Sequence, residues 1–288
     1  MRRTPVLERL LRRALERVRR SGPVLVPEYP LALRARWGWD GSALETVADL
    51  LAARVADYER MVEDVCELLD WARTIPRTAS HGGEPAWEND FWGSLDALAQ
   101  CAALKRQNPA TYLEIGSGFS TRFARRAIED FGLRTRIVSI DPDPRDEVND
   151  LCDEVVRRRL DEIDLALFNR LTPGDVVLVD GSHVALMNCD ATVFFLEVLP
   201  RLPGGVLVGI DDVFLPWDYP PTWSGRIYGE QYLLAAYLLG GASGYRVRFP
   251  GWWLMECSPL ARRFDPMWPV VENRFGRHSG SFWLERTP

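Results

Sequence analysis

"TYLEIGSGFSTRFA", residues 111–124, is the stretch of sequence that decides the fold. It opens with a mostly apolar segment that favours a strand, passes through Glu114, and turns at Gly116 and Gly118 before a helical pattern begins. A strand that ends in glycines and continues as a helix often bends around a ligand, because glycine lets the backbone approach without a Cβ atom. A glycine turn can also be no more than a turn.

Short apolar strands and amphipathic helices alternate after Pro109. We expect strands at 111–115, 135–140, 154–157, 175–180, 205–211, 244–249 and 281–286. Helices are expected at 119–131, 144–151, 160–170, 184–199 and 229–240. This alternation predicts an α/β fold with a doubly wound, mostly parallel sheet.

The first hundred residues lack this alternation and are expected to be mainly helical. Periodicity predicts helices at 4–20, from Ser42 to about Arg73, and at about 90–105, and Ser42 and Glu45 have the spacing of a capping box. We therefore expect a helical N-terminal region, 1–108, that serves as a lid, an oligomerisation element or part of the substrate side, followed by a ligand-binding domain, 109–288. Residues 87–97 either close over the ligand or pack as an ordinary helix.

The composition excludes several classes of protein. Of the 288 residues, 47% are hydrophobic and 26% charged, and the net charge is −6, which argues against a dedicated nucleic-acid binder. No apolar run approaches the ~20 residues of a membrane helix, and the arginine-rich start is no secretory signal. The five cysteines are widely scattered. We expect a cytoplasmic protein with reduced thiols.

The end of the second expected strand limits which classes of ligand the glycine turn could bind. It ends at Asp141, about 20 residues after the turn, where an acid can bind both hydroxyls of a ribose or else cap the next helix. A dinucleotide fingerprint would need a third small residue where the chain has Thr121, which disfavours a nicotinamide-dependent oxidoreductase. No phosphate-binding loop motif is present. A nucleoside without a diphosphate suggests S-adenosylmethionine.

Four motifs carry a family resemblance: YLEIGSGFST (112–121), IVSIDPDP (137–144), GDVVLVDGSHV (174–184) and GGVLVGIDDVFLPWDYP (204–220). In order and spacing the chain resembles class I S-adenosylmethionine-dependent methyltransferases, and with EQYLLAAYLL (230–239) and GSFWL (280–284) it is most similar to a bacterial small-molecule branch. The resemblance covers about residues 88–288. It implies that 109–288 is an S-adenosylmethionine-binding methyltransferase domain. It also implies cofactor-binding roles for Glu114, Gly116, Ser117, Gly118, Asp141 and Asp180, although Glu114 could instead only satisfy backbone donors.

Acids also follow the fourth and fifth expected strands, at Asp180, Asp211 and Asp212, with His183 close behind the first. Converging carboxylates repel one another unless they are protonated or bound to a cation, and oxygen ligands suit Mg²⁺ or another divalent cation. The layout resembles metal-dependent O-methyltransferases, which implies that the three acids bind metal and that His183 is the catalytic base.

The chain also departs from its most similar branch at these strand ends. Gly209-Ile210-Asp211-Asp212 stands where that branch has His-Ile-His-Asp, and Gly181 replaces a serine. The metal therefore remains open. In the alternative, Asp211 and Asp212 cap the strand and contact substrate, and backbone groups satisfy His183.

The aromatic segment 214–232 is too long for a plain connector and is expected to form a lid or one wall of the acceptor pocket. Trp217, Tyr219, Arg226 and Tyr228 are the candidate substrate contacts; the alternative for the aromatic residues is core packing.

We expect an S-adenosylmethionine-dependent methyltransferase that acts on an oxygen, or a nitrogen, of a small molecule in natural-product or sugar-linked metabolism. The expected catalytic residues are Asp180, His183 and Asp212. The expected partner is a small-molecule acceptor, with neither nucleic acid nor membrane, in a homo-oligomer. Two alternatives stay open: methylation of an amino-acid or guanidine nitrogen, and a non-catalytic nucleoside-binding protein on the same fold.

Overall fold

The computed structural model describes residues 28–144, 147–274 and 276–288. Two compact units divide the chain, Met1–Arg34 and Ala35–Pro288. In the first, the described residues 28–34 contain no helix or strand, and the helix expected at 4–20 lies outside the described residues. The domain boundary expected at residue 108 stays a prediction.

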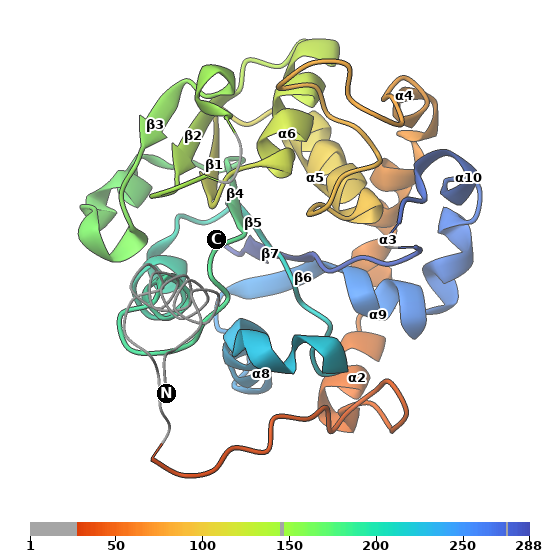
Figure 1. Cartoon of the computed structure of the whole chain (residues 1–288), viewed down its shortest axis with the longest axis vertical. Helices are drawn as coiled ribbons and strands as arrows, with labels where there is room; N and C mark the ends of the chain where they lie inside the picture. The colour runs from red at the N-terminus through yellow and green to blue at the C-terminus, as the bar shows by residue number, and fades with distance from the viewer. Residues whose placement is uncertain (1–27, 145–146, 275) are drawn as a thin grey trace, which may run out of the picture. The chain divides into compact units, whose positions relative to one another are not determined.

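The second unit is built on a seven-stranded sheet in the order β3-β2-β1-β4-β5-β7-β6 (Figure 1). The strands are β1 (Thr111–Ile115), β2 (Arg136–Ile140), β3 (Glu154–Val156), β4 (Val176–Val179), β5 (Leu207–Ile210), β6 (Tyr245–Pro250) and β7 (Phe282–Arg286). β1 to β5 pair in parallel, and only β7 runs antiparallel to its neighbours. The predicted fold class, a doubly wound and mostly parallel sheet, is confirmed.

The central strands are apolar along their whole length because both of their faces are covered. All residues of β4 and β5 are buried, as expected for parallel strands between two layers of helices. Gly209 in β5 makes room for a neighbour, since a Cβ atom there would lie 2.8 Å from the Trp283 ring on β7. The core thus continues from the parallel strands to the antiparallel one.

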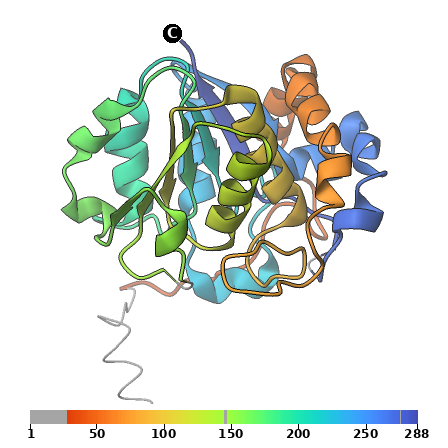
Figure 2. The same ribbon diagram turned by 90° about the horizontal axis from the view of Figure 1, so that it is seen from above.

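Helices cover both faces of the sheet (Figure 2). On one face lie α5 (Ser94–Gln107) and α6 (Phe119–Asp130), with α3 (Val55–Cys66) packed on α5. On the other lie α7 (Asp190–Val193) and η4 (Phe194–Val198). The remaining helices are α2 (Glu45–Ala52), α4 (Leu69–Ala72), η1 (Asn149–Leu151), η2 (Leu160–Glu162), η3 (Leu165–Arg170), η5 (Leu199–Arg201), η6 (Pro221–Arg226), α8 (Glu230–Leu239), α9 (Gly251–Glu256), η7 (Pro259–Phe264) and α10 (Trp268–Val271).

Four expected helices differ in the structure. Residues 160–170 form the two 3₁₀ segments η2 and η3, and among the described residues of 144–151 only η1 is helical. The helix expected from Ser42 begins at Glu45 after Leu44, without a side-chain cap, and is interrupted at Arg54, whose φ of −126° is not helical. The helix expected at 184–199 begins only at Asp190, because the Asp190 carboxylate accepts hydrogen bonds from the backbone and hydroxyl of Ser182 and folds the intervening loop back. Within the described ranges, no helix combines the length and apolarity needed to cross a membrane.

Candidate active site

The glycine turn follows β1 and lies against the end of β4. Gly116 has φ +85°, and a Cβ atom there would lie 1.8 Å from the carbonyl oxygen of Asp180. The backbone N–H of Asp180 donates to the carbonyl of Ile115 at 2.8 Å. Gly116 is therefore required by the approach of two chain segments rather than by room for a ligand. Around Gly118, in contrast, a Cβ atom would meet nothing within 4 Å.

A buried hydrogen-bond network joins the glycine turn to β1 and α5. Glu114 is fully buried and accepts from the Tyr112 hydroxyl at 2.6 Å and the Thr121 hydroxyl at 2.5 Å. The Thr121 hydroxyl in turn accepts from the backbone N–H of Gly118 at 3.1 Å, and Gln100 donates to the Tyr112 hydroxyl. Burial raises the pKa of Glu114 to about 7, against the opposing hydrogen bonds. The contact of Glu114 with cofactor stays a prediction. In the structure its carboxylate binds the hydroxyls of Tyr112 and Thr121.

Asp141 ties the end of β2 to the same turn. Its Oδ2 accepts from the backbone N–H of Ser117 at 2.9 Å and from the Ser117 hydroxyl at 3.2 Å, and its Oδ1 accepts from the N–H of Asp143 at 2.9 Å. The side chain is half-buried. The structure thus brings Ser117 and Asp141 together beside Gly118; their binding of a ribose stays a prediction.

The second group of predicted residues meets around the imidazole of His183. Its Nε2 lies 3.3 Å from Asp180 Oδ1 and 3.4 Å from Asp212 Oδ2, while its Nδ1 lies 2.9 Å from Glu230 Oε2. Burial by itself would lower the pKa of His183, but Asp212, Asp180 and Glu230 together raise it well above its ordinary value. The ring lies between the carboxylates of Asp180 and Asp212, and these neighbours favour its protonated form.

Two residues of this cluster, and one residue next to Tyr228, have positive φ values. His183, Asp212 and Ile227 have φ values of +57°, +54° and +59°, a region that residues with a Cβ atom rarely adopt and that is least favourable for β-branched isoleucine. Residues held in such conformations gather at functional sites, where the surrounding structure maintains them. Two residues of the predicted catalytic set are thus held in conformations that sequence alone does not favour.

Asp211 follows β5 directly, and the loop that precedes β7 lies near it. Burial raises the pKa of Asp211 well above its ordinary value, and the neighbouring charges of Asp212, Asp180 and Asp96 raise it further. Asp96, on α5, is itself buried and accepts from the hydroxyl of Ser279 and from the backbone N–H groups of residues 280 and 281. The N–H of Val213 donates to the carbonyl of Gly280 at 2.7 Å, so this loop fixes the end of β5.

The aromatic segment 214–232 forms a cluster over the site. Tyr219 is buried, and its hydroxyl accepts from the N–H of Gln231 at 3.1 Å, which makes it part of the support of α8. Tyr228 faces the site, with its ring 4.7 Å from that of His183. The Arg226 guanidinium lies 3.8 Å from the centre of the Trp223 ring. Trp217 packs edge-on against Trp252, and substrate contact by Trp217, Tyr219, Arg226 and Tyr228 stays a prediction.

The predicted metal site receives no support. In the part of the chain that the structure describes, no group of three His, Cys, Asp or Glu side chains is placed to hold a metal ion. Between Asp180 and Asp212, where a shared cation was expected, the Nε2 of His183 lies within 3.4 Å of both carboxylates. An imidazole thus lies at the place where the sequence left a divalent cation open.

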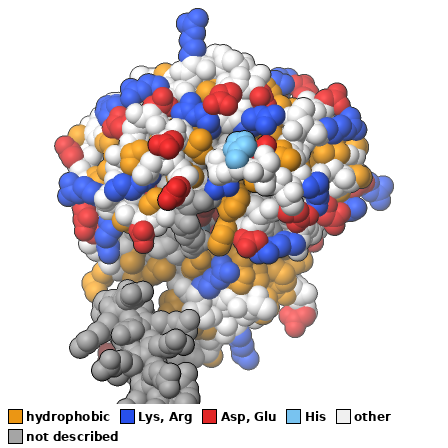
Figure 3. Space-filling model, turned by 45° about the horizontal axis from the view of Figure 1, so that its top comes forward, with side chains coloured by type: hydrophobic (Ala, Val, Ile, Leu, Met, Phe, Trp, Pro, Cys, Tyr) orange, Lys and Arg blue, Asp and Glu red, His pale blue; other side chains and the backbone are white. Residues whose placement is uncertain are grey.

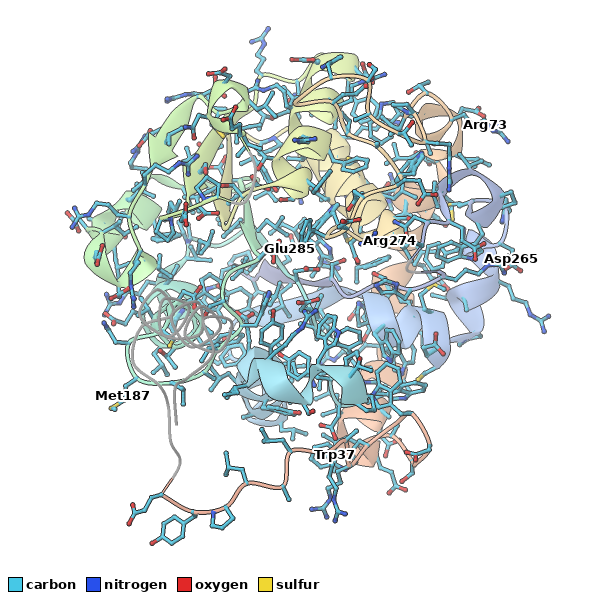
Figure 4. All side chains as sticks on the ribbon, in the orientation of Figure 1. Trp37, Arg73, Met187, Asp265, Arg274 and Glu285 are labelled. Carbon is cyan, nitrogen blue, oxygen red and sulfur yellow. The ribbon has the colours of Figure 1, made fainter. Side chains whose placement is uncertain are left out.

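A separate cleft of about 320 Å³ lies at the opposite end of the sheet, near the first residue of β5, Leu207, and near Glu285 on β7 (labelled in Figure 4). It is lined by Asp57, Arg60, Met61, Asp64, Ala103, Arg106, Gln107, Leu207, Arg248 and Glu285. Charged side chains there pair with one another: Arg60 and Arg106 contact Asp64 at 3.1 Å and 3.0 Å. None of the predicted functional residues lines this cleft.

Comparison with known proteins agrees with this geometry. Residues 113–213, which run from β1 past the end of β5, match a family model described as a methyltransferase domain. This part of the chain is therefore similar to methyltransferase domains. No curated protein matches the chain in sequence.

Solved structures with a similar arrangement share little sequence with this chain. The Podospora anserina methyltransferase PaMTH1, bound to SAH, is 15% identical, with 93% of this chain and 100% of that chain covered and a TM-score of 0.42. An O-methyltransferase from Bacillus cereus in complex with SAH is 16% identical, with 85% and 100% covered and a TM-score of 0.42. The plantazolicin methyltransferase BpumL, in complex with a substrate analogue and SAH, is 12% identical, with 65% and 83% covered and a TM-score of 0.39.

Two acids of the site were not among the sequence predictions. Glu230 opens α8 and lies far from His183 in sequence, and its only signal was the EQY motif at 230–232. Asp96 lies within the segment that was expected to close over the ligand or to pack as a helix; it does pack, in α5. Only the fold brings either residue to the strand ends.

Proposed function

We propose that this protein is an S-adenosylmethionine-dependent methyltransferase that methylates a hydroxyl oxygen of a small molecule. The observation that supports this most directly is the placement of His183 between Asp180 and Asp212, at the ends of β4 and β5. The glycine turn after β1 lies beside the same strand ends. In parallel sheets of this kind, ligands bind beyond the carboxyl ends of the strands.

The residues beside the turn suit S-adenosylmethionine. The open space at Gly118 and the carboxylate of Asp141 would accommodate a nucleoside, with Asp141 as the acceptor for the ribose hydroxyls. When bound, S-adenosylmethionine supplies an electrophilic methyl group. The contribution of this chain is to hold the acceptor oxygen in line with that group, which can account for much of the rate enhancement.

We assign proton acceptance to Asp212 rather than to His183. The carboxylates around His183 favour its protonated form, which has no free lone pair at Nε2, whereas the Asp212 side chain is 20% exposed. Burial raises the pKa of Asp212 to about 6, with Asp180 raising it and His183 opposing the rise, so that its carboxylate is available near neutral pH. The acceptor hydroxyl would lose its proton to Asp212, and the imidazolium of His183 would stabilise the remaining carboxylates.

The acceptor is proposed to carry a flat or apolar ring next to its hydroxyl. Tyr228 lies against the His183 ring, and Trp223 with the stacked guanidinium of Arg226 continues this wall. Such a wall suits a natural product or a sugar-linked compound. On the face shown in Figure 3, basic and acidic side chains are interspersed, which does not provide the continuous basic surface that nucleic acid would need.

A cationic amine or guanidine is the second candidate acceptor. Three carboxyl groups, those of Asp180, Asp212 and Glu230, lie within 3.4 Å of one imidazole, and the buried Asp211 is a further acid nearby. This surplus of acids would bind a cation, and a nitrogen nucleophile would then replace the hydroxyl. A divalent cation is the third form of the proposal, but it would have to displace His183 from between Asp180 and Asp212.

The proposal is tested with S-adenosylmethionine whose methyl group carries an isotopic label and a panel of hydroxyl and amine acceptors, with mass spectrometry as the readout. We expect a labelled hydroxyl product, and a drop in turnover of roughly 10²–10⁴-fold in Asp212→Asn. Chelation with EDTA should leave turnover unchanged. Labelled amines alone would favour the second candidate, and loss of activity in EDTA with recovery in Mg²⁺ would favour the third. Calorimetry that detected NAD binding but no S-adenosylmethionine binding would refute all three.

A further inference from the structure

We propose that Glu230 is the positioning residue for His183: it holds the imidazole through Nδ1 so that Nε2 faces the carboxylates of Asp180 and Asp212. This inference deepens the proposed function and rests on it for its catalytic consequence. The hydrogen bond from His183 Nδ1 to Glu230 can be tested in the protein without any substrate.

The contact between the two side chains is short and sealed from solvent. His183 Nδ1 and Glu230 Oε2 are 2.9 Å apart, and the two side chains are 4% and 2% exposed. In this geometry Nδ1–H donates and the carboxylate accepts. When Nδ1 donates to Glu230, Nε2 points toward Asp180 and Asp212, because the two nitrogens lie on opposite sides of the imidazole.

The backbone fixes the same pair independently. The carbonyl oxygen of His183 accepts from the N–H groups of Gly229 and Glu230, at 2.8 Å and 3.1 Å. Two of the unpaired donors at the start of α8 are thus satisfied by the residue whose side chain Glu230 binds. His183 is also held at a φ of +57°. Backbone and side chain together fix the helix start to the loop after β4.

Exposure separates Glu230 from the other acids that face His183. The side chains of Asp180 and Asp212 are 34% and 20% exposed and can reach an acceptor, whereas Glu230 is 2% exposed and cannot. The Tyr228 ring also lies against the His183 ring. The other charged neighbours are Asp211, which interacts with His183, Asp190, which raises the pKa of Glu230, and Arg226, which lowers the pKa of Asp212. Glu230 therefore acts through His183 and not on the substrate.

The experiment compares Glu230→Met, which removes the acceptor at similar size, with Glu230→Gln, which keeps an acceptor oxygen without the charge. Glu197→Gln is the control, because it removes an exposed carboxylate on η4 far from this contact in the sequence. Nitrogen-15 NMR of labelled histidine is readable here, since the chain has only three histidines and the His183→Ala variant assigns the signal. Steady-state kinetics with the acceptor found above supplies kcat and KM.

In the unaltered protein we expect a Nδ1–H signal of His183 that exchanges slowly with water. Glu230→Met should lose that signal and lower kcat by roughly 10²-fold, with KM for S-adenosylmethionine within about twofold of the unaltered value. Glu230→Gln should keep part of the Nδ1–H signal and part of kcat. Glu197→Gln should have the same signal and the same kcat as the unaltered protein.

The inference is overturned if the unaltered protein shows no proton on Nδ1, a result that needs no variant to fold. It is also overturned if Glu230→Met keeps the Nδ1–H signal or the full kcat. A lost signal in a protein that methylates none of the acceptors would refute the proposed function and leave the positioning contact established. The two failures are therefore distinguishable.

Discussion

Replacing Glu114 by glutamine should change how the stability of this protein depends on pH. The fully buried Glu114 has a pKa raised from 4.5 to about 7 in the folded chain. Folding therefore takes up a proton between these values, so the stabilising contribution is present below pH 4.5 and is lost as pH rises to about 7. At about 1.4 kcal/mol for each pKa unit, the loss amounts to roughly 3 kcal/mol. Glutamine does not titrate and should not show it.

Urea denaturation followed by tryptophan fluorescence, at pH values from 4.5 to 7.5, measures this effect. We expect the free energy of unfolding of Glu114→Gln, relative to the unaltered protein, to rise by up to roughly 3 kcal/mol across this range. Other titrating groups are common to both proteins and cancel in the difference. Glu129→Gln, at an exposed position of the adjacent helix α6, is the control and should show no such rise. A difference for Glu114→Gln that stays constant over the whole range would refute the reasoning.

Two further predictions concern the glycine turn and its acid. Gly116→Ala should lower the free energy of unfolding by at least ~3 kcal/mol, because a Cβ atom there meets a backbone oxygen at 1.8 Å. The control Gly132→Ala, at a φ of +62° with open space around it, should lower it by only about 1–2 kcal/mol. Equal losses of the two variants in urea denaturation would contradict the clash at Gly116. Asp141→Ala should weaken S-adenosylmethionine binding by roughly 1–3 kcal/mol in calorimetry, whereas Ser117→Ala, which keeps the carboxylate, should cost less; an equal effect of both would assign the loss to the turn rather than to the ribose.

The fold was predictable because its strands are short apolar runs that end in turns. β1 begins and ends where the sequence pattern placed it, and the other six strands differ from their expected bounds by one or two residues. Helices were harder: residues 160–170 form the two 3₁₀ segments η2 and η3, because an apolar period does not distinguish them from an α-helix. The start of α7 at Asp190 depends on its hydrogen bonds to Ser182, which no periodicity reports.

The candidate site was predictable to the extent that it lies at strand ends. Asp180, His183 and Asp212 follow β4 and β5 directly, so the parallel sheet brings them together. Glu230 could not be found in this way, because it reaches His183 from a helix 47 residues later. The raised pKa of His183 could not be found either, since it results from the carboxylates that surround the ring in the folded chain.

The position of β7 determines when the site can form during synthesis. β7 is the last strand in the sequence, yet it pairs with β5 in the middle of one half of the sheet. On the ribosome, β1, β2 and β3, with the glycine turn and Asp141, can pair long before residues 282–286 are translated. The end of β5 lacks its antiparallel neighbour, and Asp96 lacks its hydrogen bonds to residues 279–281, until that moment. A nascent chain can therefore order the glycine turn and Asp141 first, and the acids at the end of β5 only after residues 279–286 have been translated.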